Sequence, residues 1–478
     1  MEKHEEARRC FHNGRNVFLT GQGGTGKTHL SSELIKEAIS KERKPLLCAP
    51  TGIAALVLGG RTIHSLLGLP PSLRDLTQIQ RFADGKYRRN RRRDENTDEK
   101  IQQIANADVL VIDECSMMGV WLFQAANIIF QTYRNDFTKP FGGIQLLLVG
   151  DFRQLPPVCD SRNSDGFCFE CDLWTQLNIV VVELQKMYRQ TDPQFIELLR
   201  RIAMGELLSV EQSKLLCSRA VAPEKSNPIV QIKYTRKSVW RTNNIAFNKL
   251  IQAPRMPPLL QQEYNVPLLT WKHRDETDQA LDQCVQSVKE ALVIPMEAKI
   301  QKFCVGSRVM MIRNVPTQNL VNGHTGTIIS FARRLEAECP TDPEYVPIVK
   351  FDHGVTRIIG SYEWTIHNYT DSAYGQLRIR VVAIPLILAW ACTVHKVQGS
   401  TIHSPVEIDC VMMDKIPATF YVAMSRATTL DKIFLRNFNG QFAHCQKAVD
   451  FYRSLPKTKG DVTQSGEDEK HSIKRKRG

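Results

Sequence analysis

The chain lacks a hydrophobic run long enough to cross a membrane. Its longest apolar stretch, residues 381–394, contains Pro385 and is shorter than the roughly 20 residues that a membrane-spanning helix needs. Residues 1–10 lack the apolar segment of a secretory signal peptide, and their acidic side chains argue against a transit peptide. We therefore expect an intracellular protein without membrane contact.

A complete metal-binding cysteine motif is also missing. The 13 cysteines are an odd and scattered set, which is typical of free thiols in a reducing compartment. Cys168 and Cys171 have the spacing of metal ligands, but no second pair of cysteines or histidines nearby completes a tetrahedral site. Because both stand among aromatic residues, a role in the core is favoured, with a zinc site as the alternative.

The length and the charge exclude a small, acidic single-domain protein. A chain of 478 residues is too long for one hydrophobic core, so two or three domains are expected. The formal net charge of +13 indicates an anionic partner, and nucleic acid is the favoured one.

A glycine-rich segment carries the strongest chemical signal. Residues 21–28 have the sequence Gly-Gln-Gly-Gly-Thr-Gly-Lys-Thr, directly after an apolar stretch and before a helical pattern. This is the pattern of a phosphate-binding loop, whose backbone N–H groups and helix N-terminus face one anion. In such a loop the lysine reaches the outer phosphates, and the last threonine supplies a hydroxyl to Mg²⁺. The sequence therefore predicts a nucleoside triphosphate site made by Gly21, Gly23, Gly24, Thr25, Gly26, Lys27 and Thr28.

Polar residues at the ends of two further apolar stretches complete the predicted site. Asp113 ends the stretch 108–113 and Glu114 follows it directly, and ligands of open α/β sheets sit where strands end. Asp113 is placed to hold Mg²⁺, directly or through water, and Glu114 to polarise the attacking water. Gln154 follows the stretch 144–150 and is suited to sensing the γ-phosphate, although a plain turn is the alternative. The carboxylate pair favours hydrolysis over storage of the nucleotide.

The order of apolar and helical patterns predicts an α/β protein. Alternating strand and helix signals favour a parallel sheet over residues 1–182, and a second such set follows it. Short β-rich segments with Asn-Gly, Thr-Gly and His-Gly turns over residues 301–375 predict a small antiparallel barrel inserted into the second set. The strands are expected at residues 16–20, 45–50, 108–113, 144–150, 179–183, 229–235, 381–390 and 432–438, and a helix at 237–252.

Two strongly basic segments are predicted to be disordered when alone. Residues 88–93 hold five arginines inside a polar stretch, and residues 457–478 are rich in lysine, glycine and serine. The tail is a candidate nuclear address or a solubilising end. We accordingly assign residues 1–182 to the first domain, 183–300 with 376–456 to the second, 301–375 to the barrel and 457–478 to the tail.

Seven segments in order resemble the motifs of the petite-integration-frequency (PIF-type) DNA helicases of superfamily one. Besides the loop and the carboxylate pair, the segments that resemble motifs Ia, III, IV, V and VI are residues 49–68, 149–158, 184–195, 388–402 and 421–427. Residues 140–148 also resemble the end of the family's own characteristic stretch. The resemblance covers about residues 14–438.

The resemblance implies two RecA-like domains with ATP between them and single-stranded DNA across their tops. It implies ATP-dependent unwinding in the 5′-to-3′ direction, with Arg189 and Arg426 reaching the γ-phosphate from the second domain as arginine fingers. Gln398 and Gly399 would couple the cleft to the DNA, with Gly399 allowing close approach of the backbone. The full implied catalytic set is Lys27, Glu114, Gln154, Arg189 and Arg426.

The implied DNA contacts hold the strand without reading its sequence. They are Pro50, Thr51, His64 and Ser65 of the first domain and Thr393, His395 and Lys396 of the second. For either histidine a structural hydrogen bond is the alternative. One departure from the family is His4, which stands where an adenine-reading glutamine is usual and leaves the choice of nucleotide open.

The resemblance also implies a biological setting. We expect a monomeric motor on single-stranded and forked DNA, in the nucleus rather than the mitochondrion, serving DNA repair, recombination or telomere maintenance. The alternatives are a single-strand translocase that does not unwind and a nucleotide-gated binding module. The presence of Glu114, Arg189 and Arg426 argues against the binding module.

Overall fold

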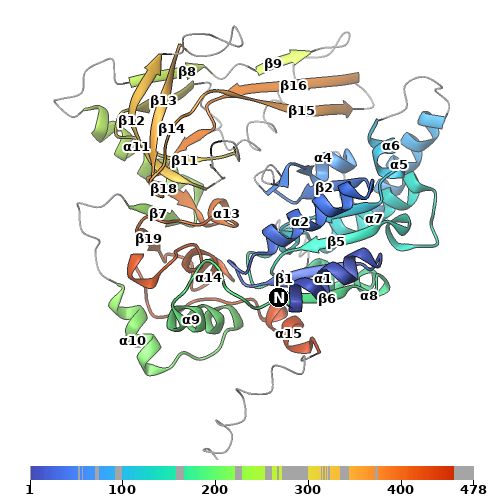
Figure 1. Cartoon of the computed structure of the whole chain (residues 1–478), viewed down its shortest axis with the longest axis horizontal. Helices are drawn as coiled ribbons and strands as arrows, with labels where there is room; N and C mark the ends of the chain where they lie inside the picture. The colour runs from blue at the N-terminus through green and yellow to red at the C-terminus, as the bar shows by residue number, and fades with distance from the viewer. Residues whose placement is uncertain are drawn as a thin grey trace, which may run out of the picture.

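Two parallel sheets and a group of antiparallel strands make up the molecule (Figure 1). The computed structural model describes residues 2–51, 54–55, 58–69, 75–91, 99–157, 166–220, 229–252, 261–265, 268–271, 300–313, 315, 318, 320, 323–333, 344–371 and 375–456. The predicted α/β class with two parallel-sheet domains is confirmed. Below, domain 1 means the elements around the first parallel sheet and domain 2 those around the second.

The first sheet has six parallel strands in the order β3-β2-β4-β5-β1-β6. Their bounds are Val17–Gly21 (β1), Pro45–Ala49 (β2), Arg61–Thr62 (β3), Val109–Ile112 (β4), Gln145–Val149 (β5) and Val180–Leu184 (β6). The five strands that were predicted here are all present, and only the short β3 is new. The central strands β1, β4 and β5 are buried along their whole length, as expected when helices cover both faces of a parallel sheet.

Alternate residues of each central strand belong to different cores. Phe18, Leu110 and Leu148 pack in one core, whereas Leu19, Val111 and Val149 pack in the other, which follows the two-residue repeat of a strand. The helices are α1 (Glu2–His12), α2 (Lys27–Ser40), α4 (Ile63–Leu67), α5 (Leu76–Arg91), α6 (Glu99–Ala105), α7 (Val120–Arg134) and α8 (Asp172–Gln176), with 3-10 turns η1 (Cys115–Met117), η2 (Pro140–Gly143) and η3 (Cys168–Glu170).

Helix α5 extends into the arginine-rich segment of domain 1. This segment was expected to be disordered, but α5 continues to Arg91. The apolar face of the helix, which begins at residue 76, favours this continuation. Residues 92–98 lie outside the described residues.

Cys168 is 1% exposed and packs in the domain 1 core. Within the described residues no group of three or more His, Cys, Asp and Glu side chains is arranged to hold a metal.

The second sheet has four parallel strands in the order β18-β7-β19-β20. They are Val230–Lys233 (β7), Ala391–Thr393 (β18), Val406–Asp409 (β19) and Ile433–Arg436 (β20). The strands predicted over 229–235 and 432–438 and the helix predicted over 237–252 are confirmed, the last as α11 (Arg236–Ile251). The other helices are α9 (Pro193–Met204), α10 (Val210–Ser218), α13 (Val394–Val397), α14 (Thr419–Met424) and the turn η6 (Leu430–Lys432).

The strand predicted over residues 381–390 was wrong in its extent and its sheet. Pro385 interrupts it, because proline has no N–H for a strand ladder. The part before the break belongs to β16 (Gly375–Ala383), and the part after it is β17 (Leu386–Leu388), which pairs antiparallel with β11 (Arg308–Met311). The second parallel sheet uses β18 instead.

The remaining strands are antiparallel, as predicted for residues 301–375. One sheet has the order β14-β13-β12-β11-β17, another β15-β16-β9, and a pair is β10-β8. Closure of these strands into a barrel stays a prediction. The bounds are Gln261–Asn265 (β8), Leu268–Trp271 (β9), Ile300–Cys304 (β10), Thr325–Arg333 (β12), Tyr345–Phe351 (β13), Thr356–Ile358 (β14) and Tyr362–Asp371 (β15).

The hairpin of β15 and β16 projects toward the side of domain 1 that carries α4 and α5 (Figure 1). The last described helix is α15 (Gln446–Ser454), and the predicted tail, residues 457–478, lies outside the described residues. None of the helices that the structure describes combines the length and the apolarity needed to cross a membrane.

Candidate nucleotide-binding site

The glycine-rich loop joins β1 to α2, as the sequence predicts. Gly24 and Gly26 have φ values of 97° and 85°, which residues with a Cβ rarely adopt. The Lys27 amine donates to the carbonyl oxygens of Gly21 at 2.7 Å and Gln22 at 3.0 Å. Burial lowers the pKa of Lys27, and the nearby carboxylate of Asp151 opposes this shift. The lysine is therefore folded back over its own loop.

The carboxylate pair stands where β4 ends. Asp113 is 6% exposed, and its Oδ1 accepts from the backbone N–H of Glu114 at 2.8 Å. Burial, and then the charge of Glu114, raises the pKa of Asp113 to about 7. A divalent cation beside these oxygens would relieve both causes, so the donor set fits Mg²⁺. Thr28, at the start of α2, lines the same cavity.

Two arginines face the loop from the other side. Arg189 donates from Nε to Thr401 Oγ1 at 2.9 Å and from Nη1 to the Ser425 carbonyl at 3.0 Å. Arg426 is 1% exposed and donates from Nε to the Val422 carbonyl at 2.9 Å. Burial lowers the pKa of both, that of Arg189 to about 9 with the charge of Arg426 as the second cause. Each guanidinium therefore gains from a nearby anion.

The loop and the arginines are in close contact. A Cβ added to Gly23 would come within 2.8 Å of Arg426 Nη2, so glycine at this position lets the guanidinium approach the loop. The backbone N–H of Tyr188 donates to the Gly24 carbonyl at 2.9 Å. The phosphate loop of domain 1 and the two arginines therefore face each other across a cavity.

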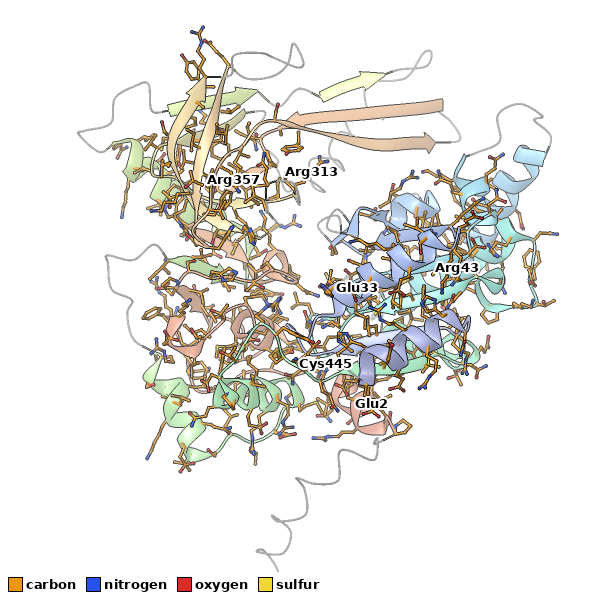
Figure 2. All side chains as sticks on the ribbon, viewed as in Figure 1. Glu2, Glu33, Arg43, Arg313, Arg357 and Cys445 are labelled. Atoms are coloured by element: carbon orange, nitrogen blue, oxygen red, sulfur yellow. The ribbon has the colours of Figure 1, made fainter. Side chains whose placement is uncertain are left out.

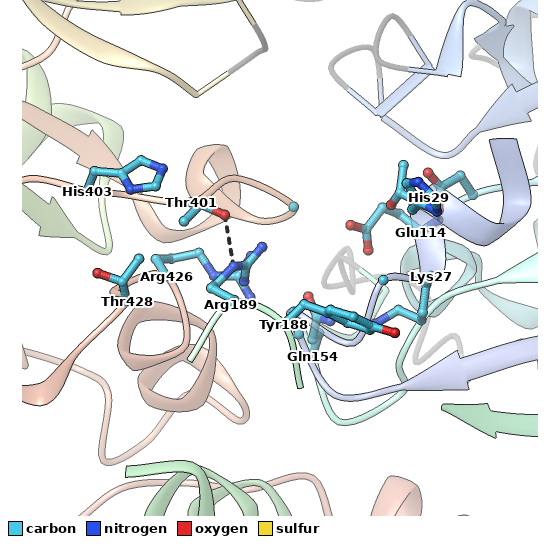
Figure 3. Close-up of a pocket in the computed structure, with 16 residues that line it drawn as sticks. Lys27, His29, Glu114, Gln154, Tyr188, Arg189, Thr401, His403, Arg426 and Thr428 are labelled. Carbon is cyan, nitrogen blue, oxygen red and sulfur yellow. Dashed lines mark hydrogen bonds between the residues drawn. The ribbon is translucent and has the colours of Figure 1, made fainter. Parts of the chain in front are cut away.

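The cavity measures about 450 Å³. Figure 3 shows Lys27, Glu114 and Gln154 on one side and Arg189 and Arg426 on the other. Gly21 and Thr25 are not part of its lining; they shape the loop from behind, Gly21 through its carbonyl and Thr25 through a bond to the Gln22 carbonyl. The lining residues are Gly23, Gly24, Gly26, Lys27, Thr28, His29, Asp113, Glu114, Gln154, Tyr188, Arg189, Gly399, Thr401, His403, Arg426 and Thr428.

Two glutamines have buried acceptor atoms at this site. Gln154 is 3% exposed, and its Oε1 has no hydrogen-bond partner within the described part of the chain. The same holds for Oε1 of Gln398, whose Nε2 donates to Glu114 Oε2 at 2.9 Å. Because buried acceptors are costly when unpaired, both amides are suited to receive a bond from a ligand, a water or a moved side chain.

Sequence reasoning missed several residues of the cavity. Tyr188 is 55% exposed, and its ring lies at van der Waals distance from the Gly26 position. An aromatic residue directly before the predicted arginine finger was the signal that could have found it, because an exposed flat ring beside a phosphate loop can stack on a base. Thr401 and His403 follow the predicted Gly399 and were not singled out.

The predicted DNA contacts form two groups, one on each parallel sheet. Pairing of β2 with β3 places the segment of Pro50 and Thr51 next to the start of α4, which carries His64 and Ser65. In domain 2, Thr393 caps α13 by accepting from the Lys396 N–H at 3.3 Å.

Both groups follow the carboxyl ends of parallel strands. His64 and His395 are exposed and Lys396 is half-buried. Burial lowers the pKa of Lys396 to about 8, and the charge of Arg236 adds to the shift. The arrangement offers polar and cationic groups on the sheet edge where ligands of α/β proteins bind.

Known proteins resemble this chain over most of its length. A family model described as PIF1-like helicase matches residues 5–213. The ATP-dependent DNA helicase PIF1 of Danio rerio is 29% identical over 452 residues, which is 93% of this chain and 62% of that protein. The chain thus spans less than two thirds of the length of this curated relative.

Solved structures give the same result. The Pif1 helicase from Candida albicans has a TM-score of 0.73 and 28% identity, with 95% of this chain and 99% of that chain covered. The Pif1 helicase from Bacteroides in complex with ADP-AlF3 and ssDNA has a TM-score of 0.62 and 26% identity, with 95% and 96% covered. In sequence and in fold this chain is similar to the PIF1-like helicases, and the resemblance predicted from its motifs is confirmed.

Proposed function

We propose that the chain is an ATP-dependent DNA helicase that moves 5′-to-3′ on single-stranded DNA and unwinds duplexes. The observation that carries this proposal is the position of Arg189 and Arg426, which line the same cavity as Lys27 from the opposite domain. A similar protein, the Bacteroides Pif1 helicase, was solved in complex with ADP-AlF3 and ssDNA, which supports a joint nucleotide and DNA function.

Binding of ATP follows from the charges and donors around the cavity. The loop N–H groups of Gly23, Gly24, Gly26 and neighbouring residues cradle the phosphates, and the Lys27 amine exchanges its two carbonyl partners for phosphate oxygens. Thr28 and Asp113 would hold Mg²⁺, which when bound neutralises charge on the phosphate oxygens during phosphoryl transfer. Tyr188 offers its exposed ring to the base.

Hydrolysis needs a base, a sensor and a cation. Glu114 accepts a proton from the attacking water, and the buried Gln154 amide contacts the γ-phosphate or that water. Arg189 and Arg426 stabilise the charge that develops on the transferred group, because a guanidinium matches phosphate oxygens with paired donors. Both guanidinium groups are buried and donate to hydroxyl and carbonyl oxygens, and burial lowers the pKa of each, which favours an anionic ligand between them.

Movement of the two domains relative to each other follows from the position of the two arginines across the cavity from the phosphate loop. Since they belong to the far side of the cavity, ATP draws the two domains together and loss of the γ-phosphate releases them. The bond from Gln398 to Glu114 ties this event to α13, which ends at Val397 and begins after Thr393. We propose that Thr393, His395 and Lys396 hold DNA on domain 2, while Pro50, Thr51, His64 and Ser65 hold it on domain 1.

We extend the proposal to domains and setting. The division into residues 1–182, 183–300 with 376–456, and 301–375 is kept as a proposal, except that α15 (Gln446–Ser454) packs in the domain 1 core. We also propose a monomeric, nuclear motor in DNA repair, recombination or telomere maintenance. Forked DNA is the proposed duplex substrate, which is supported by a similar solved structure that concerns DNA unwinding at forked dsDNA by two coordinating Pif1 helicases.

A directional unwinding assay tests the function. Fluorescent duplexes carry a 5′ overhang, a 3′ overhang or no overhang, and each is incubated with and without ATP. We expect strand separation of the 5′ substrate only, and loss of it in Glu114→Gln. Unwinding of the 3′ substrate alone would overturn the polarity, DNA-stimulated ATP hydrolysis without separation would indicate a translocase, and DNA binding gated by ATP without hydrolysis would indicate a binding module.

A further inference from the structure

Helix α15 packs in domain 1, although the strand before it in the chain belongs to domain 2. Ala448 and Tyr452 join the domain 1 core. The ring of Phe451 lies 4.5 Å from that of Phe169 and 5.1 Å from that of Phe152, measured between centroids. Cys445, at the start of α15, lies between the two parallel-sheet domains (Figure 2). The chain therefore returns to domain 1 after completing domain 2.

This return brings the Tyr452 hydroxyl under the nucleotide site. The hydroxyl accepts from the backbone N–H of Phe152 at 3.1 Å and donates to Asp151 Oδ1 at 3.2 Å. Thr20, the residue before the phosphate loop, lies 2.5 Å from it through Oγ1, and its hydroxyl is the donor when Tyr452 donates to Asp151. One side chain thus contacts both β1 and the turn after β5.

Asp151 is held from two domains at once. Its Oδ2 accepts from the Tyr421 hydroxyl at 3.3 Å, and Tyr421 in turn accepts from the Gly23 N–H at 3.2 Å. Tyr421 packs in the domain 2 core, so it moves with that domain. The other oxygen, Oδ1, is held within domain 1, by Tyr452 and by Arg153 Nε at 2.7 Å.

The same turn carries the proposed phosphate sensor. The N–H of Gln154 donates to the Asp151 carbonyl at 2.9 Å, and the N–H of Arg153 donates to Asp151 Oδ1 at 3.1 Å. The place of the Gln154 amide in the cavity therefore depends on how Asp151 and Phe152 are fixed. Tyr452 contacts both of them.

We propose that Tyr452 is a positioning residue for ATP hydrolysis, whose hydroxyl holds Asp151 and the turn bearing Gln154 in place when Tyr421 withdraws with domain 2. The proposal rests on the helicase function proposed above. It makes α15 a part of the nucleotide site rather than a terminal helix that only covers the core.

Replacement of the hydroxyl alone tests this in the full chain. In Tyr452→Phe the ring keeps its packing, and we expect kcat for DNA-stimulated ATP hydrolysis to fall about fivefold to tenfold, the effect of about one hydrogen bond. The KM for ATP should stay within about twofold, because the loop that binds the phosphates is intact. Circular dichroism should be unchanged.

A double-mutant cycle with Gln154→Ala separates positioning from general destabilisation. If Tyr452 acts through Gln154, the double variant should have the kcat of Gln154→Ala within about twofold, because coupled residues are not additive. Fully additive losses, or an unchanged kcat in Tyr452→Phe, would overturn the proposal. A wild-type chain without ATP hydrolysis would instead overturn the proposed function.

The matched control lies on the same helix. Lys447 pairs with Glu170 at 2.5 Å on the surface, so Lys447→Gln loosens α15 without touching Asp151, and kcat should stay at the wild-type value. Should Tyr452→Phe fail to fold, a fluorinated tyrosine at 452 keeps the ring and changes only the strength of the hydroxyl bond. A changed kcat at constant KM then supports the proposal, and an unchanged kcat overturns it.

Discussion

Gln398 donates from Nε2 to Oε2 of Glu114 over 2.9 Å, so the proposed catalytic base is tied to a residue of the opposite domain. Gln398 directly follows α13, which carries His395 and Lys396. A shift of α13 when DNA binds would therefore reach Glu114 through one hydrogen bond. This hydrogen bond is therefore a candidate for the contact that couples DNA binding to ATP hydrolysis.

The coupling predicts a selective loss in Gln398→Ala. We expect the DNA-stimulated rate of ATP hydrolysis to fall about tenfold, equivalent to about 1.4 kcal/mol, and the rate without DNA to fall less. Steady-state hydrolysis with and without single-stranded DNA measures both. Equal losses in the two rates would show that Gln398 serves the chemistry and not the coupling.

Lys27→Ala should abolish turnover. The amine is the cation of the loop and lies in the proposed nucleotide cavity, so its removal would leave the outer phosphates without their main partner. Lys36→Ala, on the exposed side of the same helix, is the matched control and should keep the wild-type rate. DNA-stimulated hydrolysis near the wild-type rate in Lys27→Ala would contradict the site assignment.

Replacement of Asp113 by Asn should raise the thermal stability of the chain and lower its ATP hydrolysis. Its pKa of about 7 is above the unfolded value of about 3.9, so its stabilising contribution is lost as the pH rises from about 4 through 7. At pH 8 the Asp113→Asn variant should melt a few degrees higher than the wild-type chain without nucleotide. It should also lose Mg²⁺-dependent hydrolysis.

Melting curves at pH 5 and pH 8 test this prediction, with a smaller difference expected at pH 5. Asp108→Asn is the control at the opposite, exposed end of the strand, where an amide oxygen can still accept from the Lys44 N–H. A lower melting temperature of Asp113→Asn at pH 8 would contradict the expected repulsion. The wild-type chain should also need more Mg²⁺ for half-maximal hydrolysis as the pH falls from 8 to 6.

Lys396→Ala should weaken binding of single-stranded DNA in a salt-dependent way. Loss of one phosphate contact reduces the slope of log affinity against log salt by about 1. Because the pKa of Lys396 is about 8, wild-type affinity should also fall between pH 7 and pH 9 as the cation is lost. Fluorescence anisotropy over a salt series measures both effects, and Lys214→Ala on the distant helix α10 should change neither.

Local sequence patterns predicted most of the first sheet and the phosphate loop. Each central strand is an apolar run followed within a few residues by residues that line the cavity, so the strands and the candidate site were visible together. The strand over 381–390 could not be placed, because an apolar run does not specify which sheet it joins. Pro385 was the only sign of the break, and the antiparallel partner β11 lies far away in the chain.

The contacts that α15 makes with domain 1 could not be predicted from the sequence. Tyr421 is an ordinary aromatic position in the apolar helix α14, and Tyr452 is one on the buried face of the amphipathic helix α15. Their shared partner Asp151 is about 300 residues from Tyr452. Tyr188 was closer to recognition, because it precedes Arg189. Local sequence patterns predict residues whose role depends on their own segment. They do not predict residues whose role depends on contact with a segment far away in the chain.

Two chain crossings between the parallel-sheet domains limit how they can separate. Residues 185–192 lead from β6 to α9, and residues 437–445 lead from β20 back to α15. Two connections restrict the relative motion of two domains more than one connection does, and they favour rotation about the line that joins them. We therefore expect the cavity to open mainly by rotation of one domain about these two connections, which would return the arginines to the loop along the same path in each turnover.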